Sequence, residues 1–180
     1  CLKCSGIHRQ MSTDKSKVRS ILLDKLNPII QDMLILITNN GANDLLLANP
    51  PNNVNIDPRM DEAARTAYLT SKYVNFEYST SAPIPDPFQS IIKADYYGLF
   101  HAMNFGKSEE KYKSLTPLHA AASSGNPLIT AIAACTTTSV DVEDEKGWTP
   151  LAYAIFYNNI EVIKFLVDFG AQPGHNSIDL

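Results

Sequence analysis

The chain has 180 residues, a hydrophobic content of 44% and a charged content of 19%, which are the values of an ordinary globular sequence. They exclude a disordered, highly charged chain, and the length gives room for one or two compact domains. The formal net charge of −4 hides an asymmetry, because residues 1–25 carry six basic and two acidic side chains, a charge of +4, against −8 in the remainder. This basic beginning suits an acidic protein surface, a nucleotide phosphate or an anionic membrane face.

The cysteines and the apolar runs indicate the cellular compartment and the relation of the chain to membranes. Cys1, Cys4 and Cys135 do not have the spacing of a disulfide framework, which favours a reducing compartment, the cytosol by default. The longest apolar run, Met33 to Ile37, is too short for a membrane helix, and no secretory leader is evident. Because the chain begins with a cysteine rather than a methionine, we expect it to be a fragment.

The first candidate site is the segment Cys1-Leu2-Lys3-Cys4-Ser5-Gly6-Ile7-His8-Arg9. A gap of two residues lets both thiolates reach one metal ion from one side of a tight turn. The same spacing also suits a redox pair, or two unrelated thiols in a mobile terminus. The spacing alone leaves these three interpretations open.

The next part of the chain predicts a small, mainly helical module with one short strand. Apolar and β-branched residues indicate the strand, and proline or capping residues before apolar faces indicate the helices. The expected elements are a strand over residues 18–23, a helix from Pro28 to Ile37 stopped at Asn39-Asn40-Gly41, a short helix from an Asn43 cap through Leu47, and a helix over 61–78. Residues 81–87 hold Pro83, Pro85 and Pro87 and are predicted to be a stiff, extended linker.

An internal repeat organises the rest of the chain. Thr116-Pro117-Leu118-His119-Ala120-Ala121 is followed 33 positions later by Thr149-Pro150-Leu151-Ala152-Tyr153-Ala154. Thr-Pro starts a helix, with proline at an early position where its missing N–H has no cost. The period and the motif resemble ankyrin repeats, and the resemblance covers residues 87–180. We predict a degenerate first repeat at 88–114, repeats at 115–147 and 148–180, and the start of a truncated further repeat.

Several single residues within the repeats have structural interpretations. We expect His101 and His119 to be structural residues of repeat helices, the second of them through hydrogen bonds. Cys135 is expected to be a small core residue on the second helix of its repeat. Trp148 is predicted to lie in a hairpin turn, with partner binding as the alternative.

The beginning of the chain resembles a known family. Cys1 to Arg9, together with Ser16-Lys17-Val18-Arg19-Ser20 and Leu23-Asp24, is similar to the second half of the zinc-finger domain of ArfGAP proteins, which activate Arf-type small GTPases. The resemblance implies that Cys1 and Cys4 are half of a four-cysteine structural zinc site and that Arg9 is the arginine finger. Met11, Ser12, Asp14 and Leu26 depart from the family pattern.

The two resemblances together predict a mainly α protein. Residues 1–80 would be an ArfGAP-type zinc-finger module, a small sheet plus helices, lacking its first Cys-x-x-Cys, and an ankyrin-repeat solenoid would follow it. Zn²⁺ is expected to be lost or weakly bound in this fragment. A structural zinc site with four ligands has a binding free energy of about 10–16 kcal/mol, and a site with only two of the ligands loses most of it. Stoichiometric zinc retained after dialysis against a chelator would refute that expectation.

The resemblance also implies the function and partners. The protein would activate an Arf-type GTPase in its GTP form, with Lys17, Arg19 and Asp24 at the GTPase interface and a protein partner on the ankyrin face. We expect it in the cytoplasm, peripheral on anionic trafficking membranes. The alternative is an inactive ankyrin scaffold of ArfGAP ancestry. A nucleic-acid-binding finger is disfavoured, because aromatic and basic residues are not interleaved around the cysteines.

Overall fold

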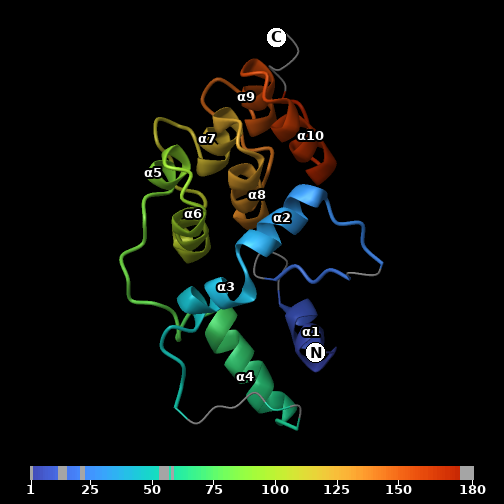
Figure 1. The fold of residues 1–180 in the computed structure, drawn as a ribbon, viewed down its shortest axis with the longest axis vertical. Coiled ribbons are helices and arrows are strands. Elements are labelled where there is room, and N and C mark those ends of the chain that lie inside the picture. Colours follow the sequence, from blue (N-terminus) through green and yellow to red (C-terminus); the bar gives the residue numbers. More distant parts are fainter. Residues whose placement is uncertain (1, 12–15, 21–22, 53–56, 58, 175–180) are drawn as a thin grey trace. The chain divides into compact units, whose positions relative to one another are not determined.

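The computed structural model describes residues 2–11, 16–20, 23–52, 57 and 59–174, and all of its named elements are helical (Figure 1). The mainly α fold class is therefore confirmed. The elements are α1 (Leu2–Gln10), α2 (Pro28–Leu36), α3 (Asn39–Leu46), α4 (Glu62–Tyr73), α5 (Pro87–Ile92), α6 (Tyr96–Ala102), the π-helical turn η1 (Met103–Lys107), α7 (Pro117–Ser124), α8 (Pro127–Thr136), α9 (Pro150–Phe156) and α10 (Ile160–Phe169). No described helix is long and apolar enough to cross a membrane.

The chain forms two compact units that are not two continuous stretches of sequence. Unit 1 comprises Cys1–Lys25 and Thr38–Ala82, and unit 2 comprises Leu26–Ile37 and Pro83–Leu180. Helices α1, α3 and α4 therefore belong to unit 1. Helix α2 belongs to unit 2, although it lies between α1 and α3 in the sequence.

Unit 1 has a small core between α1 and α4. Asp61 starts α4 by accepting a hydrogen bond from the N–H of Ala64, and the helix then buries Tyr68 and Leu69 against Ile7 of α1. Helix α3 begins at Thr38, whose hydroxyl accepts a hydrogen bond from the Gly41 N–H. The core of unit 1 is thus assembled by contacts between helices that are far apart in the sequence.

Two sequence predictions in this part of the chain are wrong. The described residues of the expected strand, 18–20 and 23, take no strand conformation, so the small sheet is not present among the described residues. A local turn replaces the strand, because Asp24 accepts from the Ser20 N–H at 2.6 Å and Ser20 accepts from the Leu23 N–H at 3.1 Å. The segment 39–41, expected to stop a helix, instead forms the first turn of α3.

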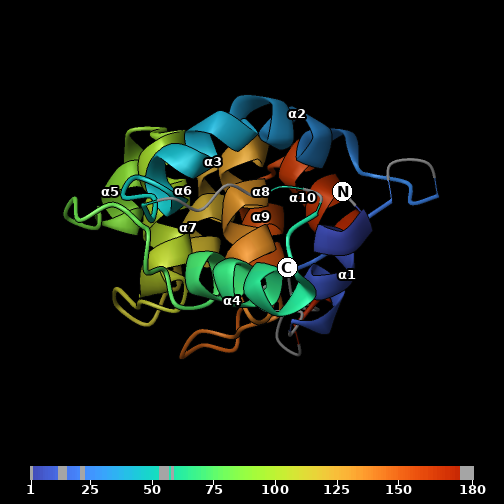
Figure 2. The same ribbon diagram turned by 90° about the horizontal axis from the view of Figure 1, so that it is seen from below.

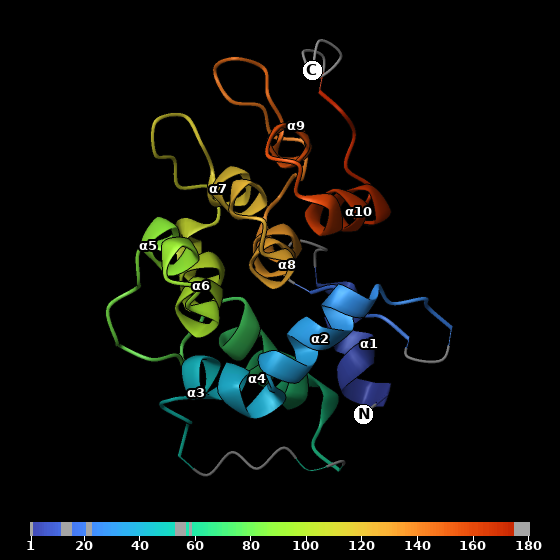
Figure 3. The same cartoon turned by 45° about the horizontal axis from the view of Figure 1, so that its top comes forward.

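Unit 2 consists of paired helices in two rows. Helices α5, α7 and α9 pack beside one another in the first row, and α6, α8 and α10 form the second row (Figure 3). Each pair is closed by a sharp turn, and Gly125 and Gly170 have the left-handed conformation expected at helix ends, with φ of 74° and 103°. The longer loops before α7 and α9 extend on the same side of the array.

Polar contacts bind one repeat to the next. The Nδ1 atom of His119 accepts from the Thr116 N–H at 3.2 Å, and its Nε2 lies 3.0 Å from the Trp148 carbonyl oxygen of the following repeat. The side-chain amide of Asn159 donates to the carbonyls of Ala122 and Ser123. The structural role predicted for His119 is thereby confirmed.

Helix α2 packs on the second row of the array. Figures 1 and 2 both show α2 beside α8, and its apolar side chains contact the core of unit 2. The Asn27 side chain before α2 donates to Asp168 of α10, and the Leu36 carbonyl accepts from the Tyr97 hydroxyl of α6. The segment 26–37 therefore bonds at both ends to helices of the array.

Candidate functional site

Helix α1 carries the candidate residues Cys4 and Arg9. Ile7 is buried against α4, and the half-buried His8 ring meets the Tyr73 ring edge to face, with centroids 4.9 Å apart. Arg9 follows them in the last turn of α1 and is exposed. The helix thus has one face fixed to α4 and presents an arginine to solvent at its end.

The surroundings of His8 favour its neutral form. Its Nδ1 lies 2.9 Å from the Ser16 hydroxyl. Burial lowers the pKa of His8, and the charge of Lys72 lowers that pKa further. Arg9 is the next side chain along α1 and is exposed.

Arg65 of α4 is a buried cation that the sequence reasoning missed. It is 1% exposed, and its guanidinium donates to the carbonyls of Asp57, at 2.7 Å, and Met60, at 3.2 Å. It also donates to the Cys4 sulfur at 3.6 Å, while its Nε has no hydrogen-bond partner among the described residues. Arg65 therefore joins the cysteine-bearing face of α1 to the start of α4.

A helical spacing could have identified this residue. Successive intervals of three, one and three residues place four side chains on one face of α4: Arg65, Tyr68, Leu69 and Lys72. Two cations on a face that is otherwise apolar indicate buried charges. Lys72 is the second one, and it donates to the Asn43 side chain at 2.6 Å and lies over the Tyr73 ring.

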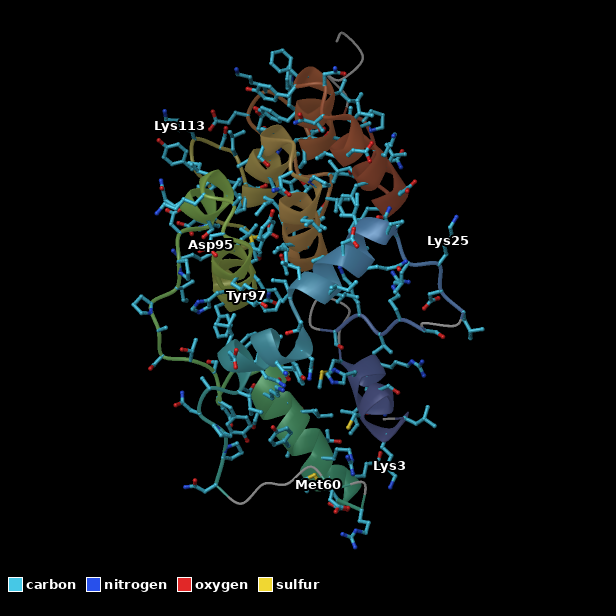
Figure 4. The ribbon with its side chains drawn as sticks, in the orientation of Figure 1. Lys3, Lys25, Met60, Asp95, Tyr97 and Lys113 are labelled. Atoms are coloured by element: carbon cyan, nitrogen blue, oxygen red, sulfur yellow. The ribbon has the colours of Figure 1, made fainter. Side chains whose placement is uncertain are left out.

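A pocket of about 290 Å³ lies between α1 and the start of α4. Figure 4 labels Lys3 and Met60, which line it from the two sides. Arg65 lines it as well, but the polar atoms of that side chain are directed to backbone carbonyls and to Cys4. The pocket is thus the gap left beside the buried guanidinium.

The described residues do not by themselves fit a complete zinc site. They contain no group of three or more cysteine, histidine or carboxylate side chains that could hold a metal ion. Cys1 lies outside the described residues, and Cys135 is half-buried on α8 of unit 2. A four-thiolate site would need ligands in addition to Cys1 and Cys4.

The other predicted interface residues follow α1. Lys17, Arg19 and Asp24 are all exposed, and the Asp24 carboxylate closes the local turn by accepting from the Ser20 N–H. Asp14, one of the departures from the family pattern, lies outside the described residues together with Ser12. The two basic side chains are therefore open to a partner, and Asp24 has a structural bond of its own.

The structure also locates the residues singled out in the repeats. His101 is buried on α6, where its ring meets Phe105 edge to face, and burial lowers the pKa of His101. Trp148 lies in the predicted hairpin turn, in which its carbonyl accepts from the Asp144 N–H at 3.0 Å. Both side chains thus have a structural role within their repeats.

Comparison with known proteins found two family matches. Residues 1–82 match the family described as "Putative GTPase activating protein for Arf", and residues 91–177 match the family of ankyrin repeats. The first matched range includes α2, which the fold assigns to unit 2.

Relatives with similar descriptions come from several organisms. The chain is 33% identical over 86 residues to "Arf-GAP with ANK repeat and PH domain-containing protein cnt-1" of Caenorhabditis elegans, covering 45% of this chain and 10% of the relative. It is 30% identical over 100 residues to "Arf-GAP with coiled-coil, ANK repeat and PH domain-containing protein 2" of Oryctolagus cuniculus, and the match covers 53% of this chain and 13% of the relative. It is 28% identical over 136 residues to "ADP-ribosylation factor GTPase-activating protein effector protein 1" of Saccharomyces cerevisiae, and the match covers 71% of this chain and 28% of the relative. The chain thus spans only a minor part of each relative.

Proposed function

Because the chain carries an ArfGap domain at residues 1–82 followed by ankyrin repeats at residues 91–177, we propose that it accelerates GTP hydrolysis by an Arf-type GTPase in its GTP form. The observation that carries the proposal is the position of Arg9. It is the arginine of the segment that resembles the ArfGAP motif, and it is exposed at the end of a helix whose other face is buried. The protein is then a regulator of its partner's reaction, and the ankyrin repeats bind a second protein.

The proposed chemistry requires a guanidinium from outside the GTPase. Negative charge develops on the β–γ bridging oxygen and on the γ-phosphoryl oxygens as GTP is hydrolysed, and stabilising that charge is most of what a protein can contribute. Arginine supplies a permanent positive charge and two parallel hydrogen bonds, and such fingers increase the rate by about 10³–10⁵. Lysine substitutes poorly because it lacks the planar fork of donors.

Three contacts support Arg9 as a preorganised finger. Ile7 fixes α1 in the core of unit 1, His8 packs on Tyr73, and Arg65 bonds to Cys4 on the preceding turn. A finger on a rigid element loses less conformational entropy when it enters the partner's active site. Arg65 is accordingly a positioning residue in this proposal, acting on Arg9 through α1.

Lys17, Arg19 and Asp24 complete the proposed GTPase interface. The two exposed cations follow α1 and suit the negative charge of the nucleotide phosphates that an Arf-type partner would bind. The charge of +4 in residues 1–25 also supports a peripheral position on anionic trafficking membranes from the cytoplasmic side.

We further propose that Cys1 and Cys4 contribute two thiolates to a structural zinc site. Zinc would rigidify the same segment that carries Arg9. The described residues do not complete the four-ligand site, and among them the contacts of α1 with α4 hold the segment that carries Arg9.

The second candidate function is an inactive interaction scaffold. The observation that favours it is the set of departures from the family pattern at Met11, Ser12, Asp14 and Leu26. In that case the ankyrin array would be the working part, and the module around α1 would have only a structural role.

A GTP-hydrolysis assay with an Arf-type GTPase separates the two candidates. The longest natural form of the protein is compared with its Arg9→Lys variant, and Arg59→Lys is the matched control on another exposed arginine of unit 1. We expect the control to keep the activity and Arg9→Lys to lose most of it. Equal activity of Arg9→Lys and the unaltered protein would remove the finger assignment, and no activity in any form would favour the scaffold.

A further inference from the structure

The third repeat presents an aromatic surface formed by Trp148, Tyr153, Phe156 and Tyr157. The ring centroids of Trp148 lie 5.3 Å from Tyr153 and 5.4 Å from Phe156, and those of Phe156 and Tyr157 are 5.1 Å apart. Phe156 is 57% exposed and Tyr157 is 54% exposed. Large apolar groups that cluster and stay this exposed commonly mark an interaction site.

The hairpin loop before α9 holds this surface in place. Asp144 accepts from the Trp148 N–H at 2.9 Å and from the Tyr153 hydroxyl at 2.7 Å. Burial and the bond to Asp144 raise the pKa of Tyr153 to about 12, so the hydroxyl stays protonated and keeps donating. The aromatic surface is therefore prebuilt and does not have to be ordered by a partner.

The loop that leads into the aromatic surface is acidic. The loop of residues 137–149 has four acidic side chains, Asp141, Glu143, Asp144 and Glu145, and one lysine, a net charge of −3. The corresponding loop before α7, residues 108–116, has two glutamates and two lysines and is neutral; Figure 4 labels one of them, Lys113. The third repeat thus combines exposed rings with negative charge, and the loop of the preceding repeat does not.

We propose that the aromatic surface of the third repeat binds a protein segment in which arginine or lysine alternates with large apolar residues. The apolar side chains of such a segment would cover Phe156 and Tyr157, and its cations would meet Glu145 and the ring faces. This inference deepens the proposed protein-binding role of the ankyrin repeats. It does not depend on the proposed activity toward a GTPase.

The single tryptophan of the chain provides the measurement. Trp148 fluorescence is titrated with three synthetic peptides of equal length: one alternating arginine and leucine, one with glutamate in place of arginine, and one with serine in place of leucine. We expect the arginine–leucine peptide to shift the emission and to bind at least about tenfold more tightly than either of the others. A tenfold difference in affinity corresponds to about 1.4 kcal/mol.

Substitutions then assign the binding to this surface. Phe156→Ser and Glu145→Lys should each weaken the arginine–leucine peptide about tenfold or more. Val167→Ser is the matched control, because Val167 is a similarly exposed apolar residue on α10, and it should leave the affinity unchanged. All three positions are exposed, so circular dichroism should show an unchanged fold.

Several results would overturn the inference. One is that the glutamate peptide binds as tightly as the arginine–leucine peptide, and another is that no peptide changes the fluorescence. A third is that Val167→Ser weakens the arginine–leucine peptide as much as Phe156→Ser does. Self-association of the protein that Phe156→Ser abolishes, without peptide binding, would mean that a second copy occupies the surface. A protein that binds the arginine–leucine peptide but leaves GTP hydrolysis unchanged would retain this inference and lose the proposed activity.

Discussion

The two units bury polar groups of different kinds. In unit 2 the fully buried polar side chains are neutral, and His119, Thr130 and Thr149 all have hydrogen-bond partners. Among the described residues of unit 1 the buried polar side chains are two cations, Arg65 and Lys72, which donate to carbonyls, an amide and a sulfur. A cation buried without a counter-charge carries a desolvation cost, and unit 2 buries no charged side chain among its described residues, although the Nε2 atom of its neutral His101 has no hydrogen-bond partner there.

This difference is the one expected between a scaffold and a working site. The repeats of unit 2 follow the local preferences at their helix ends, with Thr-Pro starts before α7 and α9 and a left-handed glycine after α7 and α10, although Ala94 and Asn158 in the turns between paired helices have positive φ. Unusually buried charges collect at functional sites more often than elsewhere. The buried guanidinium lies directly behind the helix that carries Arg9.

The largest expected stability effect is at Ile37, which is 7% exposed and packs in unit 2. Ile37→Ala should lower the free energy of unfolding by about 2–5 kcal/mol, the usual range for a truncated core residue. Ile35→Ala is the control on the same segment, since Ile35 is 74% exposed, and it should change stability by less than about 0.5 kcal/mol. Hydrogen exchange should show lost protection in α8 and unchanged protection in α4. Loss in α4 instead would contradict the assignment of 26–37 to unit 2.

A smaller effect is expected at Arg65 in unit 1. Arg65→Met removes the charged donors from the carbonyls of Asp57 and Met60 and should cost about 2–3 kcal/mol. Arg59→Met changes an exposed arginine nearby and should have no comparable effect. Denaturant unfolding followed by exchange in α4 and α8 distinguishes the units. If Arg65→Met is as stable as the unaltered chain, the hydrogen bonds of the buried guanidinium do not stabilise unit 1.

The smallest expected effect is the pH response of His119. Burial lowers its pKa, and Nδ1 must stay unprotonated to accept from the Thr116 N–H. The unfolded chain therefore binds more protons than the folded one below the ordinary histidine pKa of about 6.5, and unit 2 should lose stability as the pH falls from there. His119→Gln should flatten the response, apart from the part that His101, whose pKa is also lowered, contributes. Stability of unit 2 that rises on acidification from pH 6.5 would contradict this sign.

The repeats were predictable because their signals are local. Thr116-Pro117 and Thr149-Pro150 start helices in any context, and a period of 33 residues can be read without knowing any distant contact. The family resemblance likewise located Arg9 and the cysteines within one short segment. The fold class and the candidate finger thus needed no three-dimensional information.

The failures concern long-range contacts. Asn39-Asn40-Gly41 reads as a helix stop, and only the Thr38 cap and the packing that follows make it a helix start. Nothing in the apolar face of residues 28–37 tells whether it meets α4 or α8. The burial of Arg65 and Lys72 depends on Cys4 and Asn43, which are 61 and 29 residues away in the sequence. The helical spacing of the two cations could therefore suggest that they are buried, but it could not identify their partners.

The most direct test of the account is the affinity of the protein for a transition-state mimic. An Arf-type GTPase is loaded with GDP and fluoroaluminate, and its affinity for the longest natural form of the protein is compared with that of the GDP form alone. Since a finger contacts the phosphoryl group chiefly in the transition state, fluoroaluminate should tighten binding at least about a hundredfold, and Arg9→Lys should abolish most of that gain. Equal tightening with and without the arginine, or none in the unaltered protein, would contradict the assignment of Arg9.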